Sequence, residues 1–332
     1  MTANLPSETE LDFNPSEWAA KLLAAHDLGD GGALRRMQGC SNEIWASDTH
    51  VVRISSGRFD RSLHYEAGVL EALTHLPCPR VVAGGQVGGR EWMIQTRLAG
   101  ETLMQAWPRL TLADRERAVR SLAQGLRGVH ATLLSAELRE PPWRAPALAH
   151  GGDLSTALRL DPIHYRRLVD ANLERHTAPA DLLHAASVLI ATRLPLFEDD
   201  VPVLTHGDAT FTNVIWDGAT ASLIDFETSG AAPLDRELDL LLRFIVELEA
   251  VSPDAARETK ALYQPVIGWL RDAYPEMFAH PALVERLEVY DALWELVQLL
   301  NYPPGHPRNT VARLEAIVTG HAPWKTALAA ST

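Results

Sequence analysis

The residues from position 203 to position 225 carry the side chains that are best suited to catalysis. The stretch reads VLTHGDATFTNVIWDGATASLID, with Asp208 five positions before Asn213 and Asp225 twelve positions after Asn213. The segment between Asn213 and Asp225 predicts two short strands joined by an Asp-Gly turn. The chain therefore folds back on itself, and we expect Asn213 and Asp225 to lie near each other.

These residue types meet the needs of phosphoryl transfer. A carboxylate must orient the acceptor hydroxyl or take its proton, and hard oxygen ligands must hold Mg²⁺ against the phosphates. Mg²⁺ keeps several waters at about 2.1 Å, so one or two side chains plus phosphate oxygens complete its shell. Asp208 suits the first role, and Asn213 and Asp225 suit the second. Each residue alone could be a turn cap, a bend residue or a strand end, but their joint spacing favours chemistry.

The residues before this segment predict a small strand-rich lobe at positions 1–98. Short apolar segments separated by turn residues indicate strands, and two stretches with helical periodicity flank them. The expected elements are a helix capped by Asn14, strands at Ala33–Gln38, Glu43–Ala46 and Val51–Ser55, a helix from Ser62 to Leu76, and a hairpin (Val81–Ala83 and Glu91–Leu98) with its turn at Gly84–Gly89.

The remainder, residues 99–332, predicts a larger and mostly helical lobe. Apolar residues recur at a spacing near 3.6 in Leu112–Leu134, Leu238–Leu248 and Leu283–Asn301. One short strand pair, Asn213–Trp216 with Ser222–Phe226, interrupts the helices. The chain is therefore predicted to have an α+β, two-lobed architecture.

The catalytic segment resembles a known family. His206-Gly207-Asp208, Asn213 and the run Ile224-Asp225-Phe226-Glu227 resemble the catalytic loop and metal motif of aminoglycoside phosphotransferase-like enzymes, whose superfamily includes choline kinases. The resemblance implies a protein-kinase-like bilobal fold that phosphorylates small molecules. It also implies that Asp208 is the catalytic base, that Asn213 and Asp225 bind Mg²⁺, and that ATP or GTP is the phosphate donor.

The same resemblance assigns nucleotide-binding residues in the first lobe. In the family, the loop between the first two strands covers the phosphates, which implies this role for Ser41 and Asn42. Arg53 stands where the third strand normally presents a lysine, and arginine keeps the charge and can hold a phosphate with two hydrogen bonds. Gln95 and Arg97 resemble the hinge that offers backbone groups to the base, at the border between the lobes.

Glu66 is expected to pair with Arg53. It matches the helix glutamate that pairs with the basic residue in the family, and its own position supports this. Glu66 shares a helical stripe with Leu63, Leu70 and Leu73, so it should point inward. A carboxylate on an apolar face is costly unless it is paired, although a first-turn glutamate is also favoured by the helix dipole.

Four further polar residues have roles that the resemblance only suggests. Asp239 resembles the structural aspartate that steadies the catalytic loop, and His206 is expected to support that loop. His130 is expected to be structural. Two roles are open for Glu227: it contacts the metal or the substrate, or it is a solvated turn residue.

The amino-acid composition indicates which kinds of binding partner and which cellular compartment to expect. The net charge of −13 argues against a nucleic-acid binder and is compatible with a cationic substrate. Two cysteines exclude a disulfide framework and fit a reducing compartment. The N-terminus lacks the pattern of a signal peptide, and the most apolar stretch, residues 182–197, is interrupted by charged residues and a proline. We expect a cytoplasmic protein with no membrane association and no obligate protein partner.

The predicted function is transfer of the γ-phosphate of Mg-bound ATP or GTP to a hydroxyl of a small molecule. An antibiotic, such as an aminoglycoside or a macrolide, is the first candidate acceptor. A choline, ethanolamine or sugar kinase is the metabolic alternative. A non-catalytic nucleotide-binding module is a third reading, suggested by Arg53 in place of lysine, but such a module has no need of a base at Asp208.

Overall fold

The computed structural model describes residues 14–29, 33–37, 39, 42–56, 62–139, 162–251, 262–301 and 309–329. Its first part is built on an antiparallel sheet of five strands in the order β1-β2-β3-β5-β4. This order is that of a three-strand meander followed by a hairpin, as the sequence predicts. The strands are β1 (Arg35–Met37), β2 (Asn42–Ala46), β3 (His50–Ser55), β4 (Val81–Val87) and β5 (Arg90–Thr96).

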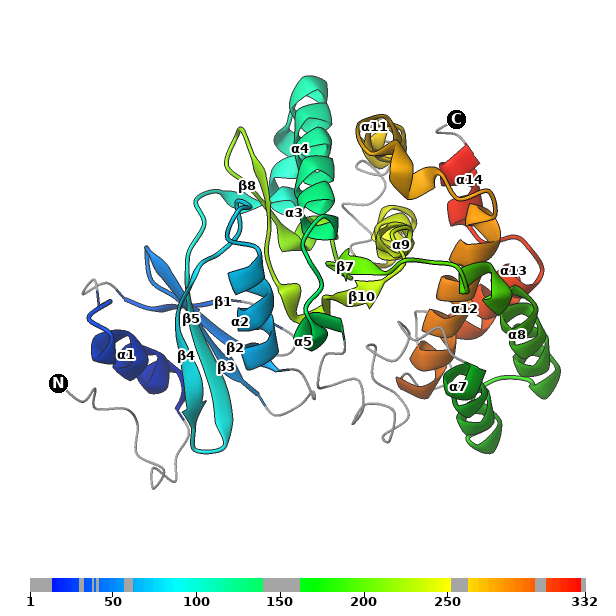
Figure 1. The fold of residues 1–332 in the computed structure, drawn as a ribbon, viewed down its shortest axis with the longest axis horizontal. Coiled ribbons are helices and arrows are strands. Elements are labelled where there is room, and N and C mark those ends of the chain that lie inside the picture. The colour runs from blue at the N-terminus through cyan, green and yellow to red at the C-terminus, as the bar shows by residue number, and fades with distance from the viewer. Residues whose placement is uncertain are drawn as a thin grey trace.

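Helices cover both faces of this sheet (Figure 1). Helix α1 (Pro15–Ala25) is capped by the Asn14 side chain, which accepts hydrogen bonds from two backbone N–H groups. Its Trp18 packs in one apolar cluster with Val52 and Trp92. Because side chains alternate along a strand, neighbouring residues such as Arg53 point to the opposite face, where α2 (Leu63–Ala72) lies.

Two predicted boundaries in this lobe are wrong. Gly84 and Gly85 belong to β4 and not to a turn, and the turn is confined to Gly88 and Gly89. A Cβ on Gly85 would lie 3.1 Å from the Trp92 ring, so the glycine makes room for the indole on the paired strand. Helix α2 ends at Ala72 and not at Leu76, because the Arg80 guanidinium bonds carbonyls in the turn that follows.

The second part of the chain is mainly helical and packs around one large apolar core. Helix α12 lies at its centre and contacts α7, α8, α9 and α13. The helices are α3 (Leu103–Ala106), α4 (Leu112–His130), α5 (Ala136–Arg139), α7 (Pro162–Glu174), α8 (Ala180–Arg193), α9 (Arg236–Val251), α11 (Val266–Ala273), α12 (Leu283–Asn301), α13 (Thr310–Val318) and α14 (Trp324–Ala329).

Two small sheets hold the catalytic segment between these helices and the first lobe (Figure 1). The predicted hairpin is present as β8 (Val214–Trp216) and β9 (Ala221–Leu223), and β6 (Glu101–Thr102) adds to it after the border between the lobes. The pair β7 (Val203–Thr205) and β10 (Gly230–Ala232) was not predicted. Strands of two or three residues are too short to show an alternating pattern in the sequence.

One segment, Ala180–Phe197, is long and apolar enough by composition to cross a membrane, and 17% of it is buried. A single segment of this kind is weak evidence for a span. Leu183, Ala186 and Ile190 of this segment are fully buried in the apolar core. A cytoplasmic location stays a prediction.

Candidate active site

The segment from β7 to β10 is mostly buried, but it leaves the predicted catalytic side chains accessible. Asp208, Asn213 and Asp225 are each half-buried, whereas Ala209, Phe211 and Phe226 beside them are buried. Polar side chains that stay partly open within a buried stretch are available to a ligand.

Asp208 and Asn213 are joined directly. The Asn213 Nδ2 group lies 3.0 Å from both the backbone oxygen and a carboxylate oxygen of Asp208. The Asn213 backbone oxygen in turn accepts a hydrogen bond of 3.0 Å from the Ile224 N–H, one residue before Asp225. The structure therefore brings the predicted base and the two predicted metal ligands into one neighbourhood, as the hairpin predicts.

His206 connects the loop that carries Asp208 with the strand end that precedes Asp225. Its Nε2 lies 2.9 Å from the Ile224 oxygen and so donates, while its Nδ1 accepts a 3.2 Å hydrogen bond from the Asp208 N–H. Burial lowers the pKa of His206, which keeps the ring neutral, as this arrangement requires. Gly207 has φ +81°, and a Cβ there would lie 2.6 Å from the Thr228 oxygen, so glycine is needed for the tight turn.

Glu237 supports the catalytic loop through hydrogen bonds, which is the role predicted for Asp239. The Glu237 carboxylate accepts hydrogen bonds from the backbone N–H groups of His206 and Gly207. Asp239 instead pairs with Arg236 and Arg243. The expectation for Asp239 is therefore wrong. Both acids lie in α9, two residues apart, and their positions along the chain do not show which one faces the loop.

Glu237 remains ionised in its buried position. Burial raises its pKa, but the His130 imidazole, with Nε2 3.5 Å from the carboxylate, and the Gly207 N–H outweigh this effect and lower the pKa below its usual value. His130 also lies 3.0 Å from the Tyr274 hydroxyl through Nδ1. His130 is thus part of the support beneath the catalytic loop.

Arg53 and Glu66 form the expected ion pair between β3 and α2. Arg53 Nη1 lies 2.5 Å from Glu66 Oε1, and the two side chains are 4% and 1% exposed. The same Glu66 oxygen accepts a 3.1 Å hydrogen bond from the Phe226 N–H in the second lobe. Burial, together with the nearby carboxylates of Asp225 and Glu227, raises the pKa of Glu66 above its usual value, and the Arg53 guanidinium opposes this shift by favouring the ionised form.

Asp225 is the open member of this cluster. Its side chain is 33% exposed and lies 2.8 Å from Arg53 Nη2. Its φ of 65° is in the left-handed region, which a non-glycine residue rarely adopts and which often marks a functional position.

The donor set at Asn213 and Asp225 fits Mg²⁺. Among the described residues, the side-chain hydrogen bonds of Asn213 use its nitrogen, which leaves the amide oxygen for coordination. Glu66, Asp225 and Glu227 offer oxygens within 4.8 Å of one another, and oxygen is the ligand that Mg²⁺ prefers.

The other predicted nucleotide-binding residues are placed in different ways. Asn42 is in this cluster, with Nδ2 3.2 Å from Glu227 Oε2, whereas Ser41 lies outside the described residues. Gln95 shares the face of the sheet with Arg53, because β3 and β5 pair Val51 with Gln95 and Arg53 with Met93. Its buried Oε1 has no hydrogen-bond partner in the described part of the chain.

Arg97 is bound away from the cluster. Its guanidinium lies 2.8 Å from the Ser47 oxygen, and its backbone N–H lies 2.8 Å from the Thr49 oxygen. Both contacts are with the turn between β2 and β3. The predicted role of Arg97, to offer backbone groups to the base, stays a prediction.

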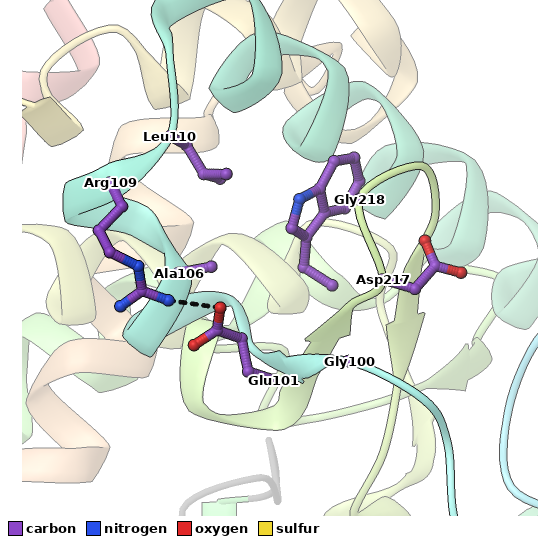
Figure 2. Close-up of a pocket in the computed structure, with 8 residues that line it drawn as sticks. Gly100, Glu101, Ala106, Arg109, Leu110, Asp217 and Gly218 are labelled. Carbon is purple, nitrogen blue, oxygen red and sulfur yellow. Dashed lines mark hydrogen bonds and ion pairs between the residues drawn. The ribbon is translucent and has the colours of Figure 1, made fainter.

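An open groove of about 500 Å³ lies beyond the hinge, between α3 and the tip of the β8–β9 hairpin. Figure 2 shows Leu110 and Ala106 in its wall and an ion pair between Arg109 and Glu101 at its edge. None of the predicted catalytic or nucleotide-binding residues lines it. The groove is therefore separate from the predicted catalytic and nucleotide-binding residues.

Comparison with known proteins identifies the family of the chain. Residues 34–277 match the model of the APH family, described as the phosphotransferase enzyme family. The match covers most of the chain, and the protein belongs to this family. No curated protein matches the sequence.

Several solved structures share the fold. A choline/ethanolamine kinase family protein from Mesorhizobium loti is 20% identical, with a TM-score of 0.61, and the match covers 95% of this chain and 98% of that one. The aminoglycoside phosphotransferase APH(2'')-IIa in a streptomycin–ATP complex is 15% identical, with a TM-score of 0.57 over 93% and 97% of the chains. APH(4)-Ia with AMP-PNP and hygromycin B is 14% identical, with a TM-score of 0.60 over 92% and 98%.

These neighbours confirm the predicted fold class, a kinase-like α+β protein with a strand-rich first part and a larger helical part. Together with the family match, they support small-molecule phosphotransferase activity as the general class of function. At these identities they do not indicate the acceptor.

Proposed function

We propose that this protein transfers the γ-phosphate of a Mg-bound nucleotide, ATP or GTP, to a hydroxyl of a small molecule. The observation that carries the proposal is the Asp208–Asn213 contact, 3.0 Å long, placed one backbone hydrogen bond away from the Asp225 segment. A base beside hard oxygen ligands is the arrangement that phosphoryl transfer needs. Structural neighbours bound to ATP and AMP-PNP support a nucleotide as the donor.

Each residue of the cluster has a separate role in this proposal. Asp208 orients the acceptor hydroxyl and takes its proton, and Asn213 holds the Asp208 carboxylate in place. Asn213 and Asp225 would bind Mg²⁺, which supplies neutralisation of the phosphate oxygens. Arg53 keeps its positive charge beside them, positioned by Glu66. Catalysis of this kind depends on positioning and on fixed charges.

The proposed acceptor is an antibiotic with free hydroxyl groups. Support comes from the family and from neighbours whose structures hold streptomycin, gentamicin or hygromycin B. The net charge of −13 is compatible with a cationic acceptor of the aminoglycoside type.

A metabolic kinase acting on an amino alcohol such as choline is the second candidate. The observation that favours it is the match to the choline/ethanolamine kinase family protein, which has a TM-score of 0.61 and 20% identity. The run Ile224–Glu227 also resembles the metal motif of that branch.

The test is an incubation of the protein with Mg²⁺ and ATP or GTP against hydroxylated antibiotics, choline and simple sugars. Mass spectrometry detects a phosphate adduct, with Asp208→Asn as the control. An adduct that forms only with the wild-type protein supports the proposal and identifies the acceptor class. Absence of Mg-dependent nucleotide binding would contradict the proposal.

A further inference from the structure

One side chain of the second lobe contacts the turn that is predicted to cover the phosphates. Glu227 lies two residues after Asp225 and is 8% exposed. Its Oε2 atom accepts a hydrogen bond of 3.2 Å from Asn42 Nδ2 and one of 3.3 Å from Arg53 Nη2. Both donors belong to the first lobe, so Glu227 joins the two lobes at the edge of the candidate metal site.

Asn42 is the residue through which Glu227 contacts strand β2. It is the first residue of β2, and it is itself 8% exposed. Its backbone oxygen is close to Gly39, where a Cβ would lie 2.9 Å from it. The Asn42 side chain therefore ties the start of β2 to Glu227 in the second lobe, two residues from Asp225 in the sequence.

The energetics favour a persistent contact. A buried carboxylate is costly unless donors surround it, and hydrogen bonds to charged groups are stronger than neutral ones. Asn42 supplies one such donor from β2, and Arg53 supplies the other from β3.

We propose that Asn42 and Glu227 form an inter-lobe clamp that fixes the start of β2 beside Arg53 and the metal motif and thereby sets the affinity for the Mg-nucleotide. Both are positioning residues in this proposal, acting through the placement of β2 against the second lobe. The clamp rests on the function proposed above. It differs from the expectation that Asn42 touches a phosphate, because here its amide nitrogen is used by Glu227.

A double-mutant cycle tests the clamp without knowledge of the acceptor. The variants are Asn42→Ala, Glu227→Ala and the double variant, titrated with AMP-PNP and Mg²⁺ by calorimetry. Asn42→Ala should raise the dissociation constant about tenfold, the size of one lost hydrogen bond to a charged group. In the Glu227→Ala background the same change should have an effect smaller than about twofold. Glu227→Leu replaces Glu227→Ala if the latter does not fold, because leucine removes the acceptor and keeps most of the volume.

Asn172→Ala is the matched control. Asn172 is also a fully buried asparagine, but its amide bonds Leu168 and Leu296 in the second lobe. This variant should lose stability and keep its nucleotide affinity. A second measurement needs no ligand: amide hydrogen exchange at residues 42–46 should become faster in Asn42→Ala and stay unchanged in Asn172→Ala.

The outcomes separate the inference from the proposed function. Unchanged affinity in Asn42→Ala, or unchanged exchange at residues 42–46, would overturn the clamp. An undiminished tenfold effect in the Glu227→Ala background would also overturn it, and would show that Asn42 contacts the phosphate itself. If the wild-type protein binds no Mg-nucleotide, the proposed function fails, and the clamp fails with it.

Discussion

Two arginines, Arg53 and Arg286, are buried to a similar extent, with 4% and 1% of their surface exposed, but their surroundings differ. Arg286 in α12 lies 2.6 and 2.8 Å from the two oxygens of Asp235, and its third nitrogen lies 2.6 Å from the Leu196 oxygen. Its guanidinium also stacks 4.2 Å from the Phe197 ring centre. Every nitrogen of this guanidinium is engaged within the protein.

Arg53 is surrounded by more acid and is less completely satisfied. Glu66, Asp225 and Glu227 all contact its two terminal nitrogens, while its Nε has no hydrogen-bond partner among the described residues. The Asp225 side chain is 33% exposed, against 5% for Asp235. A charge cluster that is complete serves the fold, whereas a cluster with surplus carboxylates and an open side is suited to bind a cation with its phosphates.

The largest expected effect is at Asp208, beside the open cluster. Asp208→Asn removes the base but preserves size and the contact to Asn213, so turnover should fall by about 10³- to 10⁴-fold. Nucleotide affinity and the unfolding midpoint should change little. Once the acceptor is identified, steady-state kinetics measures the loss. Turnover equal to that of the wild type would show that the base lies elsewhere.

Arg286→Met should affect the fold and not the binding of nucleotide. Removing one partner of a buried ion pair leaves Asp235 uncompensated, so the free energy of unfolding should fall by about 3–5 kcal/mol. Urea denaturation followed by circular dichroism measures this value. The control is Arg109→Ala, whose ion pair with Glu101 is exposed, so its loss should change the free energy of unfolding far less. Equal losses in the two variants would show that the buried Arg286–Asp235 pair contributes no more to stability than an exposed pair.

Asp225→Asn, in contrast to Arg286→Met, should weaken nucleotide binding and leave stability nearly unchanged. It removes one of the carboxylates around Arg53 and a predicted metal ligand, so Mg-dependent nucleotide affinity should fall by about 10- to 100-fold. The free energy of unfolding should change by less than about 1 kcal/mol, because Glu66 and Glu227 remain beside the guanidinium. Calorimetric titrations with and without Mg²⁺ measure the first effect. A variant that retains full Mg²⁺ dependence would remove Asp225 from the metal site.

The smallest expected effect is a pH dependence of stability from His206. Burial lowers the pKa of His206 in the folded state, so the unfolded chain binds the proton more readily. The stabilisation is therefore present above the ordinary pKa of about 6.5 and is lost as the pH falls below it. The slope is at most about 1.4 kcal/mol per pH unit for one proton. In His206→Gln, denaturation between pH 6.5 and 5 should show a shallower slope; an unchanged slope would assign the pH dependence to other groups.

Much of the architecture was predictable because its signals are local. Helix α12 has the predicted bounds, Asn14 caps the first helix as expected, and Glu66 faces Arg53 as its helical stripe indicates. The predicted kinase-like fold is confirmed, and small-molecule phosphotransfer is supported at the level of the family. The acceptor and the roles of the individual site residues stay proposals.

The features that were not predicted correctly all depend on contacts between residues that lie apart in the sequence. The β7–β10 pair joins residues far apart in sequence, and its three-residue strands carry no periodic signal. Gly85 looks like a turn residue until Trp92 is seen packed against it. Glu237 and Asp239 have the same chemistry two residues apart, and only the packing of α9 decides which of them reaches the catalytic loop.

The reactive groups and their order along the chain could be read from the amino-acid sequence. Asp208, Asn213 and Asp225 stand at spacings that a hairpin can bring together, and that much is local geometry. The tertiary structure alone decided the partners across the lobes, including Glu227 with Asn42 and Glu237 with the loop. The physical reason is that burial and hydrogen bonding depend on which surfaces meet, and residues 185 positions apart meet only after folding.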